Sequence, residues 1–212
     1  MLRFSRDLAT AHDSVIFTAL LLLAIGYLLG AIPSGYIAGR WLKGIDLRNC
    51  GSGSTGATNV LRNVGKGPAL AVFLIDVGKG ALAVLLAKSV GLNDWIQVLA
   101  GLAALAGHIW PVWLGWNGGK AVATGFGMFL GLAWPVGLAC FGLFMAMISI
   151  FRIVSLSSVV AAIGLPLLIL LSGGSSAFLV VSLVASLMVL WRHRSNIKRL
   201  IAGSEPKIGQ KT

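Results

Sequence analysis

Long apolar runs separated by short polar segments dominate the sequence. The runs at 14–40, 68–90, 95–114, 154–171 and 176–191 are each close to the roughly 17–25 residues that a helix needs to cross a lipid bilayer. The first run is interrupted at Pro33, Ser34 and Gly35, and a Ser-Gly-Gly-Ser turn at 172–175 separates the last two. The pattern predicts an all-α, polytopic integral membrane protein that forms a single domain over residues 1–212.

A further apolar stretch, 121–150, is too long for one straight span. Trp134 and Pro135 stand at its middle, and a proline disfavours helical backbone in the residue before it. We therefore predict two short spans, 121–133 and 135–150. This gives seven transmembrane helices and puts the two termini on opposite sides of the membrane. One bent span over this stretch would give six, which is the alternative.

The composition supports a membrane protein and argues against a soluble nucleic-acid-binding protein and against a disulfide-rich or metal-binding one. Of the residues, 57% are hydrophobic and 11% are charged, against about 25% charged in an ordinary soluble domain. The net charge of +11 would suggest nucleic acid in a soluble protein, but no soluble basic face is predicted, so we expect no nucleic-acid partner. Cys50 and Cys140 form neither a metal-ligand spacing nor a disulfide framework. No motif calls for a metal or a cofactor.

The basic residues are distributed unevenly between the predicted connections. All but Arg3, Arg6, Lys79 and Lys88 of the 17 Lys and Arg residues lie in or beside 41–67, 115–120, 151–155 and 192–212. Cytoplasmic loops of membrane proteins carry such an excess of Lys and Arg. We therefore predict that these four segments and the C-terminus are cytoplasmic and that the N-terminus is outside.

The first of these segments carries a glycine-rich motif with polar donors. A G-x-G-x-x-G spacing occurs at 51–56, but a dinucleotide site would need a βαβ unit, which helical flanks exclude. Glycines let backbone N–H groups approach an anion, and a following helix N-terminus favours negative charge. We therefore favour a phosphate-binding loop over a merely flexible one. Its candidate residues are Gly51, Ser52, Gly53, Thr58, Asn59 and Arg62.

The second segment places Gly118, Gly119 and Lys120 at the start of the run 121–133. A glycine-rich backbone with a lysine at a helix start is another candidate anion site. The spacing is not that of a P-loop, because Ala121 stands where that motif has Ser or Thr. Taken alone, Lys120 could simply extend to the membrane surface, and His108 could be a structural histidine.

The third and fourth segments are individually ambiguous. Arg152, Ser155 and Ser158 could bind an anion, but serines in membrane helices often bond their own i−4 carbonyl, and Arg152 could anchor the topology. In the tail, His193 and Asn196 share a helical face. The other residues there could form a basic flank that binds anionic lipid.

Two charges lie inside the run 68–90. Asp76 and Lys79 are i, i+3 neighbours that can pair, and charges inside a membrane are costly unless they face a polar interior. We assign the pair an orienting role. The four predicted cytoplasmic segments, taken together, supply hydrogen-bond donors rather than acids. They predict one surface for strongly anionic, doubly phosphorylated ligands.

Three sequence blocks resemble those of one enzyme family. The blocks are GSGSTGATNVLR at 51–62, GHIWPVWLGWNGGKAVAT at 107–124 and RIVSLSS at 152–158, supported by DVGKG at 76–80 and HRSN at 193–196. Their order and spacing resemble the PlsY family of bacterial membrane acyltransferases, which move a fatty acyl group from acyl phosphate to glycerol 3-phosphate. The chain departs from the family at Ser54, Thr55, Trp116 and Ala121, none of which is an assigned phosphate donor.

The resemblance implies an activity, a location and roles for residues. It implies the first acylation of phospholipid synthesis, at the bacterial inner membrane with a cytoplasmic active site, without metal or cofactor. The oligomeric state stays open. The implied catalytic residues are Ser52, Lys120, Ser158, His193 and Asn196. The implied phosphate-binding residues are Gly51, Gly53, Thr58, Asn59, Arg62, Gly118, Gly119, Arg152 and Ser155, with Asp76, Lys79 and His108 orienting them.

The residues also limit the mechanism. An acyl phosphate is already activated, so the enzyme must mainly bring two phosphates together. No H-x-x-x-x-D sequence occurs, which removes the His–Asp acyltransferase mechanism. The base is then His193 or a substrate phosphate oxygen. We favour phosphate, because Arg192 and Arg194 beside His193 should lower its pKa. The acyl chain is expected in a groove beside the runs 68–90 and 121–133.

A transporter for a phosphorylated solute is the rival from another class. Transporters commonly contain two matching halves with broken helices at mid-membrane, and no such internal repeat occurs here.

Overall fold

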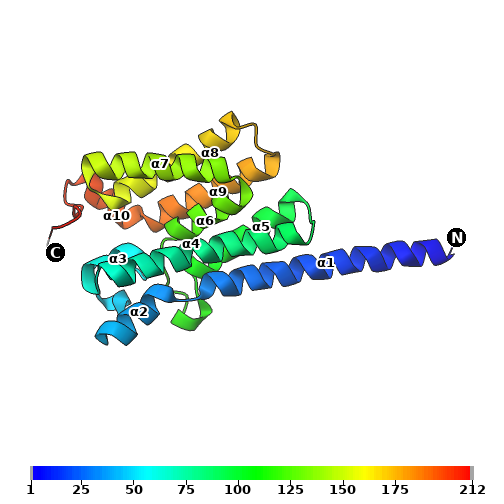
Figure 1. The fold of residues 1–212 in the computed structure, drawn as a ribbon, viewed down its shortest axis with the longest axis horizontal. Helices are drawn as coiled ribbons and strands as arrows, with labels where there is room; N and C mark the ends of the chain where they lie inside the picture. The colour runs from blue at the N-terminus through cyan, green and yellow to red at the C-terminus, as the bar shows by residue number, and fades with distance from the viewer. Residues whose placement is uncertain (1, 211–212) are drawn as a thin grey trace.

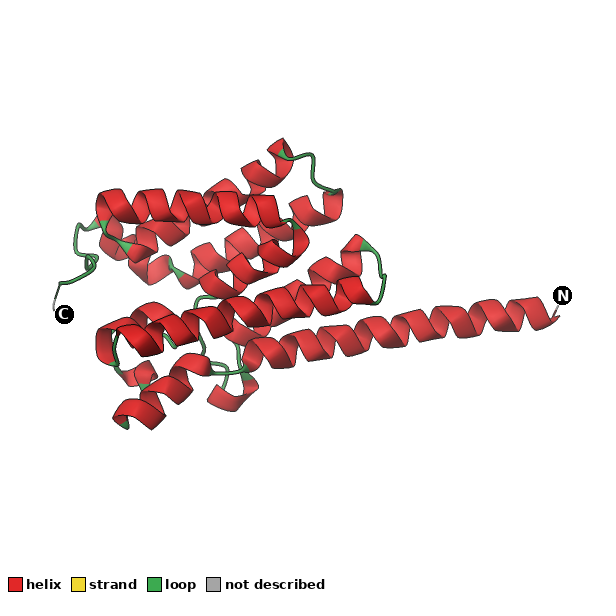
Figure 2. Cartoon of the chain, viewed as in Figure 1, coloured by secondary structure: helices red, strands yellow, loops and turns green. Residues whose placement is uncertain are grey.

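A computed structural model of the chain describes the backbone of residues 2–210 and the side chains of residues 13–210. Arg3, Arg6 and Lys211, which contribute to the predicted charge asymmetry, therefore lie outside the described side chains. The described residues form helices joined by turns and loops, without a strand (Figure 2). The helices are α1 Leu2–Ala31, α2 Ser34–Lys43, η1 Leu47–Asn49, α3 Ala57–Asn63, α4 Lys66–Ser89, α5 Asp94–Ile109, η2 Val112–Leu114, α6 Val122–Leu132, α7 Trp134–Phe151, α8 Val154–Leu171, α9 Ser176–Arg192 and α10 Arg194–Ile201.

The all-helical, membrane-spanning class predicted from the sequence is confirmed. Among the described residues, five helical segments are long and apolar enough to cross a membrane, and α9 with α10, bent by 63°, makes a sixth. Helix α6 has only 11 residues, about 16 Å at 1.5 Å per residue, which is short of a hydrocarbon core about 30 Å thick. The count of seven spans and the orientation of the termini stay predictions.

Both breaks that prolines predict in the apolar runs occur in the structure. Helix α1 ends at Ala31 and α2 begins at Ser34, while α6 ends at Leu132 and α7 begins at Trp134. A helix end in an apolar surrounding needs partners for its free carbonyls. At the first break Lys79 donates to the Ile32 carbonyl at 3.2 Å. At the second, Lys88 donates to the last carbonyls of α6, including Gly131 at 2.6 Å.

The predicted span 95–114 agrees with a candidate membrane span over Asp94–Leu114, in which the α-helix itself ends before the last residues. Helix α5 ends at Ile109, because Pro111 follows and Trp110 leaves helical backbone at φ −125° and ψ 65°. Residues 110–121 form a loop that contains the short helix η2.

Helix α6 packs along the second half of α4. A Cβ atom at Gly80 of α4 would overlap the backbone of Thr124, and one at Gly127 of α6 would overlap the backbone of Val77. Small residues of this kind let two membrane helices touch at their backbones. With Lys88 at the far end of α6, the two helices run parallel, and α6 begins about halfway along α4. This arrangement leaves room beneath the start of α6 for a pocket.

The connections fall into two groups at opposite ends of the molecule. In Figure 1, α2, α3, α10 and the C-terminus lie at one end, and the α4–α5 and α8–α9 turns lie at the other. Three of the four segments predicted to be cytoplasmic, 41–67, 151–155 and 192–212, thus share one end (Figure 1), and the fourth contacts the tail there through the hydrogen bond from Lys120 to Asn196. Between the two ends, α4 to α9 bury a core cluster that includes Val84, Leu105, Phe129, Ile169 and Val181.

Candidate active site

A pocket of about 140 Å³ lies at the end where the four polar segments meet. It is lined by residues from the first polar segment (residues 51–56 and α3), from α4 and α5, from the 110–121 loop, from α6, α7 and α8, and from the tail after α9. Eleven of its lining residues were predicted from the sequence to belong to the site: Ser52, Thr58, Asn59, Arg62, Asp76, His108, Lys120, Ser155, Ser158, His193 and Asn196. Tertiary folding therefore brings all four predicted segments to one cavity.

Asn59 organises the first loop instead of presenting free donors. Its amide nitrogen donates to the carbonyls of Leu47, Cys50 and Ser54 at 2.8–3.0 Å. Its amide oxygen accepts from the Ser52 N–H at 3.2 Å. Because both of its N–H groups are taken by the backbone and only 1% of the residue is exposed, the prediction that Asn59 donates directly to phosphate is not supported. Its function is to hold Ser52 at the pocket.

The first loop also presents side chains that are free to bind a ligand. Thr58 and Arg62 line the pocket, and neither side chain makes a hydrogen bond or ion pair with another described residue. Gly51 and Gly53 do not line the cavity. They adopt positive φ angles of 54° and 66°, which glycine reaches at little cost, and so they shape the turn. The Gly53 N–H is taken by the Cys50 carbonyl at 3.0 Å.

Gly118 and Gly119 position Lys120 but do not offer their own N–H groups. The N–H of Gly118 donates to the Ile109 carbonyl and that of Gly119 to the His108 carbonyl. Arg192 donates to both glycine carbonyls, at 3.1 and 3.0 Å. A Cβ at Gly119 would overlap the His108 ring. These glycines therefore pack the loop so that Lys120 reaches the pocket, and their role in phosphate binding stays a prediction.

Lys120 is tied to the tail through Asn196. Its ammonium donates to Asn196 Oδ1 at 2.6 Å. Burial lowers the pKa of Lys120 from 10.5 to about 8, aided by Arg199, Arg192 and Arg62 and opposed by Glu205. Lys120 therefore carries its charge at neutral pH and loses it as pH rises through about 8.

Glu205 is the site residue that sequence reasoning missed. Its carboxylate accepts from Ser155 Oγ at 2.7 Å, from Asn196 Nδ2 at 2.6 Å and from Arg199 Nε at 2.7 Å. Burial would raise the pKa of Glu205, but these three hydrogen bonds outweigh it and lower the pKa. Because Glu205 and Asp76 are acids in the pocket lining, they contradict the expectation that the polar segments supply only hydrogen-bond donors. A lone acid in a basic tail is the signal that could have revealed it.

His193 is buried and neutral at the pocket wall. Its Nδ1 lies 2.8 Å from the Val189 carbonyl oxygen, which can only accept, so Nδ1 carries the hydrogen and Nε2 is left as an acceptor. Burial lowers the pKa of His193 to about 4, with Lys120 and Arg192 contributing in the same direction. The predicted direction of the shift is right, but burial rather than the neighbouring arginines is its main cause.

Ser158 of α8 has a local partner, and Arg152 lies outside the cavity. Ser158 Oγ donates to the Val154 carbonyl at 2.9 Å, the i−4 bond that a serine in a membrane helix commonly makes. A hydroxyl retains acceptor capacity in such a bond. Arg152 instead forms two hydrogen bonds with Ile208 of the tail. Its Nη2 donates to the Ile208 carbonyl at 3.2 Å, and its own carbonyl accepts from the Ile208 N–H at 2.7 Å. Its predicted contact with phosphate is not supported.

A buried ion pair forms the floor of the pocket. Lys79 Nζ lies 2.9 Å from Asp76 Oδ1, which confirms the predicted i, i+3 pair. Ser34 Oγ, from the break between α1 and α2, donates to the same oxygen at 2.7 Å. His108 Nδ1 lies 3.7 Å from this carboxylate and 3.2 Å from Thr124 Oγ1. The cluster thus joins α2, α4, α5 and α6 beneath the polar cavity.

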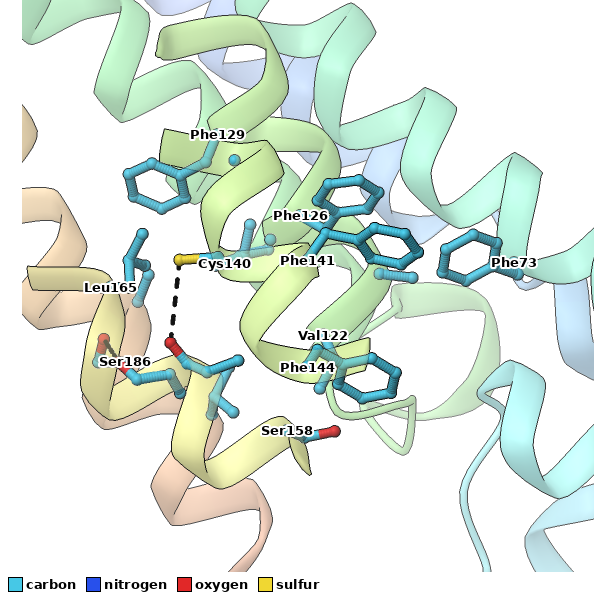
Figure 3. A pocket seen from close by; sticks show the side chains of 18 residues that line it. Phe73, Val122, Phe126, Phe129, Cys140, Phe141, Phe144, Ser158, Leu165 and Ser186 are labelled. Carbon is cyan, nitrogen blue, oxygen red and sulfur yellow. Dashed lines mark hydrogen bonds between the residues drawn. The ribbon is translucent and has the colours of Figure 1, made fainter. Parts of the chain in front are cut away.

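An apolar cavity adjoins the polar pocket. The two share Phe73, Val122, Ala123, Phe144 and Ser158 in their walls. The apolar cavity continues between α6, α7, α8 and α9, and Figure 3 shows Ser158 at one end of it and Phe129 at the other. A charged head group and an apolar tail of one ligand could therefore be held side by side. Among the described residues, no group of three or more His, Cys, Asp or Glu residues could hold a metal ion.

Known proteins are similar to this chain over nearly its whole length. Residues 20–203 match a family model described as glycerol-3-phosphate acyltransferase. A protein of that name from Parasynechococcus marenigrum is 87% identical over 211 residues, which cover 100% of both chains. Another from a Synechococcus species is 91% identical over 195 residues, covering 92% of this chain and 96% of the relative.

Solved structures show the same fold. The crystal structure of PlsY, an integral membrane glycerol 3-phosphate acyltransferase, in its glycerol 3-phosphate form has a TM-score of 0.87 and 40% sequence identity. The lysophosphatidic acid form of PlsY has a TM-score of 0.84 and 38% identity. Each similarity covers 91% of this chain and 96% of the other.

Proposed function

The chain belongs to the glycerol-3-phosphate acyltransferase family, and from this premise we propose that it transfers a fatty acyl group from acyl phosphate to the 1-hydroxyl of glycerol 3-phosphate. The products are 1-acyl-glycerol 3-phosphate, which is lysophosphatidate, and inorganic phosphate. One observation carries the proposal. A pocket that holds Arg62 and Lys120 opens at Ser158 into a cavity whose walls are almost entirely apolar.

The two cavities match the two parts of the proposed donor. An acyl phosphate has an anionic head directly bonded to an apolar chain, so it needs a cationic and an apolar surface in direct contact. Ser158, Val122 and Phe144 belong to both walls and mark where the acyl carbonyl would lie. The acceptor has no long apolar part and fits the polar pocket alone. The groove is beside α4 and α6, as expected, but α7, α8 and α9 form most of it.

The two phosphates need separate partners in the polar pocket. Arg62 and Thr58 come from the first loop, and Lys120 comes from the second. Hydrogen bonds between an ionised donor and a phosphate are about twice as strong as neutral ones. Ser52 adds a hydroxyl group to the pocket lining, whereas Ser155 donates its only hydroxyl hydrogen to Glu205. We assign Arg62, Thr58, Lys120 and Ser52 to phosphate binding, and Asn196 to holding Lys120 in place.

The reaction needs positioning more than a strong base. The acceptor hydroxyl oxygen bonds to the acyl carbon, the bond from that carbon to the bridging phosphate oxygen breaks, and phosphate leaves. Correct placement of two reactants supplies about 7–11 kcal/mol of such a barrier, and donors at the developing charge supply more. The cationic groups that hold the phosphates therefore also stabilise the leaving group.

A substrate phosphate oxygen takes the hydroxyl proton in our proposal. The second pKa of a phosphate monoester is about 6, whereas the pKa of His193 is about 4. The phosphate is thus the stronger base. His193 Nε2, which has no hydrogen, accepts a hydrogen bond from the other hydroxyl of glycerol 3-phosphate, so that the hydrogen of the attacking hydroxyl is free to pass to the phosphate oxygen.

Purified protein in detergent tests the activity directly. Radiolabelled glycerol 3-phosphate and palmitoyl phosphate should give labelled lysophosphatidate without a sealed compartment. Lys120→Met should lower the rate about hundredfold, the effect of removing one donor from developing charge. Lys198→Gln, which changes an exposed lysine of the same tail, is the matched control. Accumulation of labelled solute in sealed vesicles, without product in detergent, would instead indicate a transporter.

The proposed site faces the cytoplasm, where glycerol 3-phosphate is available. The support is the excess of Lys and Arg at the end of the molecule that carries the pocket. Lys66→Cys and Lys198→Cys, each made in a cysteine-free background, should not react with an impermeant maleimide in intact spheroplasts. Both should react in inverted inner-membrane vesicles, where the cytoplasmic face is outside. A cysteine at 173, in the opposite turn, should react in intact spheroplasts. The reverse pattern would contradict the orientation.

A further inference from the structure

The apolar cavity has the same depth on three of its walls. From the end that it shares with the polar pocket, it extends from Val122 to Phe129 on α6, from Ser158 to Leu165 on α8 and from Phe144 to Gly137 on α7. Each distance is seven residues along a helix, or about 10 Å at 1.5 Å per residue. The equal lengths indicate a cavity that ends at one level.

Packed side chains close the cavity at that level. Phe129 is 2% exposed and Leu165 is 8% exposed. Directly beyond them, Leu132, Val136 and Ile169 are buried in the core cluster of the same helices. Protein interiors of this kind contain few voids larger than a water molecule. A straight ligand chain entering at Ser158 therefore meets the end of the cavity at Phe129 and Leu165.

One side of the cavity carries a row of phenylalanines that reaches the lipid-facing surface. Phe73 of α4, Phe126 of α6 and Phe141 and Phe144 of α7 stack at ring-centre distances of 6.4, 4.9 and 6.4 Å. All four side chains are only partly buried. In Figure 3 the row leads away from Cys140 and Leu165. Because Phe73 and Phe144 also line the polar pocket, the row borders the side of the cavity and not its closed end, so a chain longer than the cavity can leave sideways between α4 and α7.

We propose that the cavity encloses only the carboxyl-proximal part of the acyl chain, and that Gly125 and Cys140 determine which chains it accepts. The proposal rests on the proposed function. An extended chain advances roughly 1.2 Å per bond, so about 10 Å of cavity holds about eight carbons. The enzyme then discriminates against acyl chains that are bulky near the carboxyl group. It discriminates little between chains that differ only in the distal part, which lies in lipid.

Gly125 of α6 and Cys140 of α7 both line the cavity about midway along its length. A Cβ added at Gly125 would meet no heavy atom within 4 Å, so a larger side chain there fills the cavity without displacing the fold. The Cys140 thiol points toward α8, where the Ala161 carbonyl lies 4.0 Å away (Figure 3). Gly125 is three residues, about 4.5 Å, beyond Val122, which leaves space for about four carbons.

The test compares long and short donors on matched variants. Wild type and Gly125→Leu are assayed with palmitoyl and butyryl phosphate, and the ratio of the two kcat/KM values is measured. Gly125→Leu should lower the palmitoyl-to-butyryl ratio at least tenfold while butyryl transfer is retained. Gly142→Leu is the control: Gly142 is exposed on α7, outside the cavity, and also has no atom within 4 Å of an added Cβ. Its ratio should stay at the wild-type value.

A second variant and a second substrate pair keep the test decisive. If Gly125→Leu does not fold, Cys140→Phe makes the same comparison from α7, with Cys140→Ala as its control. Wild type should also discriminate a methyl branch at carbon 6 of palmitoyl phosphate at least fivefold more strongly than one at carbon 14.

The outcomes separate this proposal from the proposed function. An unchanged palmitoyl-to-butyryl ratio in the folded variants would overturn the assignment of Gly125 and Cys140, as would equal loss with both donors. Equal effects of the two branches would show that the enclosed segment is not the carboxyl-proximal one. A folded wild type that transfers no acyl group from any acyl phosphate would instead contradict the proposed function itself.

Discussion

The Lys120 ammonium and the Asn196 carboxamide oxygen, 2.6 Å apart, join two segments that are 76 residues apart in the sequence. Asn196 in turn donates to Glu205 at 2.6 Å. The amide therefore separates the positive from the negative group. Because Lys120 is not directly neutralised by the carboxylate, it keeps charge available for an anionic ligand.

The pH dependence of acceptor capture should follow the charge of Lys120. Its pKa is lowered from 10.5 to about 8, so the ammonium is present below pH 8 and is lost as pH rises through that value. The ratio kcat/KM for glycerol 3-phosphate reports groups of the free enzyme. This kcat/KM value should fall as pH rises above 8, and the midpoint of the fall should lie near pH 8. Lys120→Arg stays protonated throughout and should move this midpoint above pH 10, even if its rate is lower. A wild-type profile that is flat from pH 7 to 9.5 would contradict this role.

Replacement of His193 should separate orientation from proton transfer. His193→Ala removes the acceptor at Nε2, and we expect kcat to fall about hundredfold or more, within the range for a positioned group of this kind. His193→Gln keeps a polar atom in reach without a basic nitrogen and should retain at least tenfold more activity than His193→Ala if phosphate is the base. Equal loss in both variants would favour His193 as the base, and wild-type rates in both would remove it from the site.

The pH dependence of protein stability should reflect the lowered pKa of His193. Because its folded pKa is about 4 instead of 6.5, the folded protein keeps this side chain neutral across pH 5–7. The unfolded chain binds the proton more readily between pH 6.5 and 4, so His193 reduces stability as pH falls through that window. His193→Gln should therefore lose less stability between pH 6.5 and 5 than wild type. Thermal unfolding in detergent measures it, and an identical pH slope would be the contrary result.

Glu205 should matter for structure more than for charge. Glu205→Leu removes the shared acceptor of Ser155, Asn196 and Arg199. Ser155 and Asn196 are buried, and each buried polar group without a partner costs about 1–3 kcal/mol, whereas Arg199 is partly exposed and can bind water. We expect a lower unfolding temperature and an increased KM for glycerol 3-phosphate, since Asn196 no longer holds Lys120. Glu205→Gln keeps an acceptor oxygen for Ser155 and Asn196 and should be close to wild type in both measurements. If Glu205→Leu unfolds at the wild-type temperature, the tail does not depend on this contact.

Asp76 and Lys79 should show strong coupling. Removing one partner leaves a buried charge uncompensated, which costs about 3–5 kcal/mol in such pairs, whereas removing both avoids that penalty. Asp76→Leu and Lys79→Met should each destabilise the protein more than the double variant does. A double-mutant cycle on thermal unfolding in detergent gives the coupling. Additive effects would show that the pair is not interdependent.

The sequence by itself determined the class of fold and most of the residues that line the site. Apolar run length and proline chemistry are local properties, so the helices and the breaks near Pro33 and Pro135 follow from residues that are adjacent in the chain. The polar residue types in the four segments equally predict an anion pocket. The i, i+3 pair of Asp76 and Lys79 is local as well.

Only the tertiary structure decided which of those polar groups face a ligand and which face the protein. Asn59, Gly118 and Gly119 have donors of the expected kind, yet backbone carbonyls from other segments take them. Glu205 enters the pocket because Ser155, 50 residues away, and Asn196 supply its partners there. A buried polar group needs a hydrogen-bond partner, and that partner is chosen by proximity in space. Sequence spacing alone does not contain that information once the contacts join different helices.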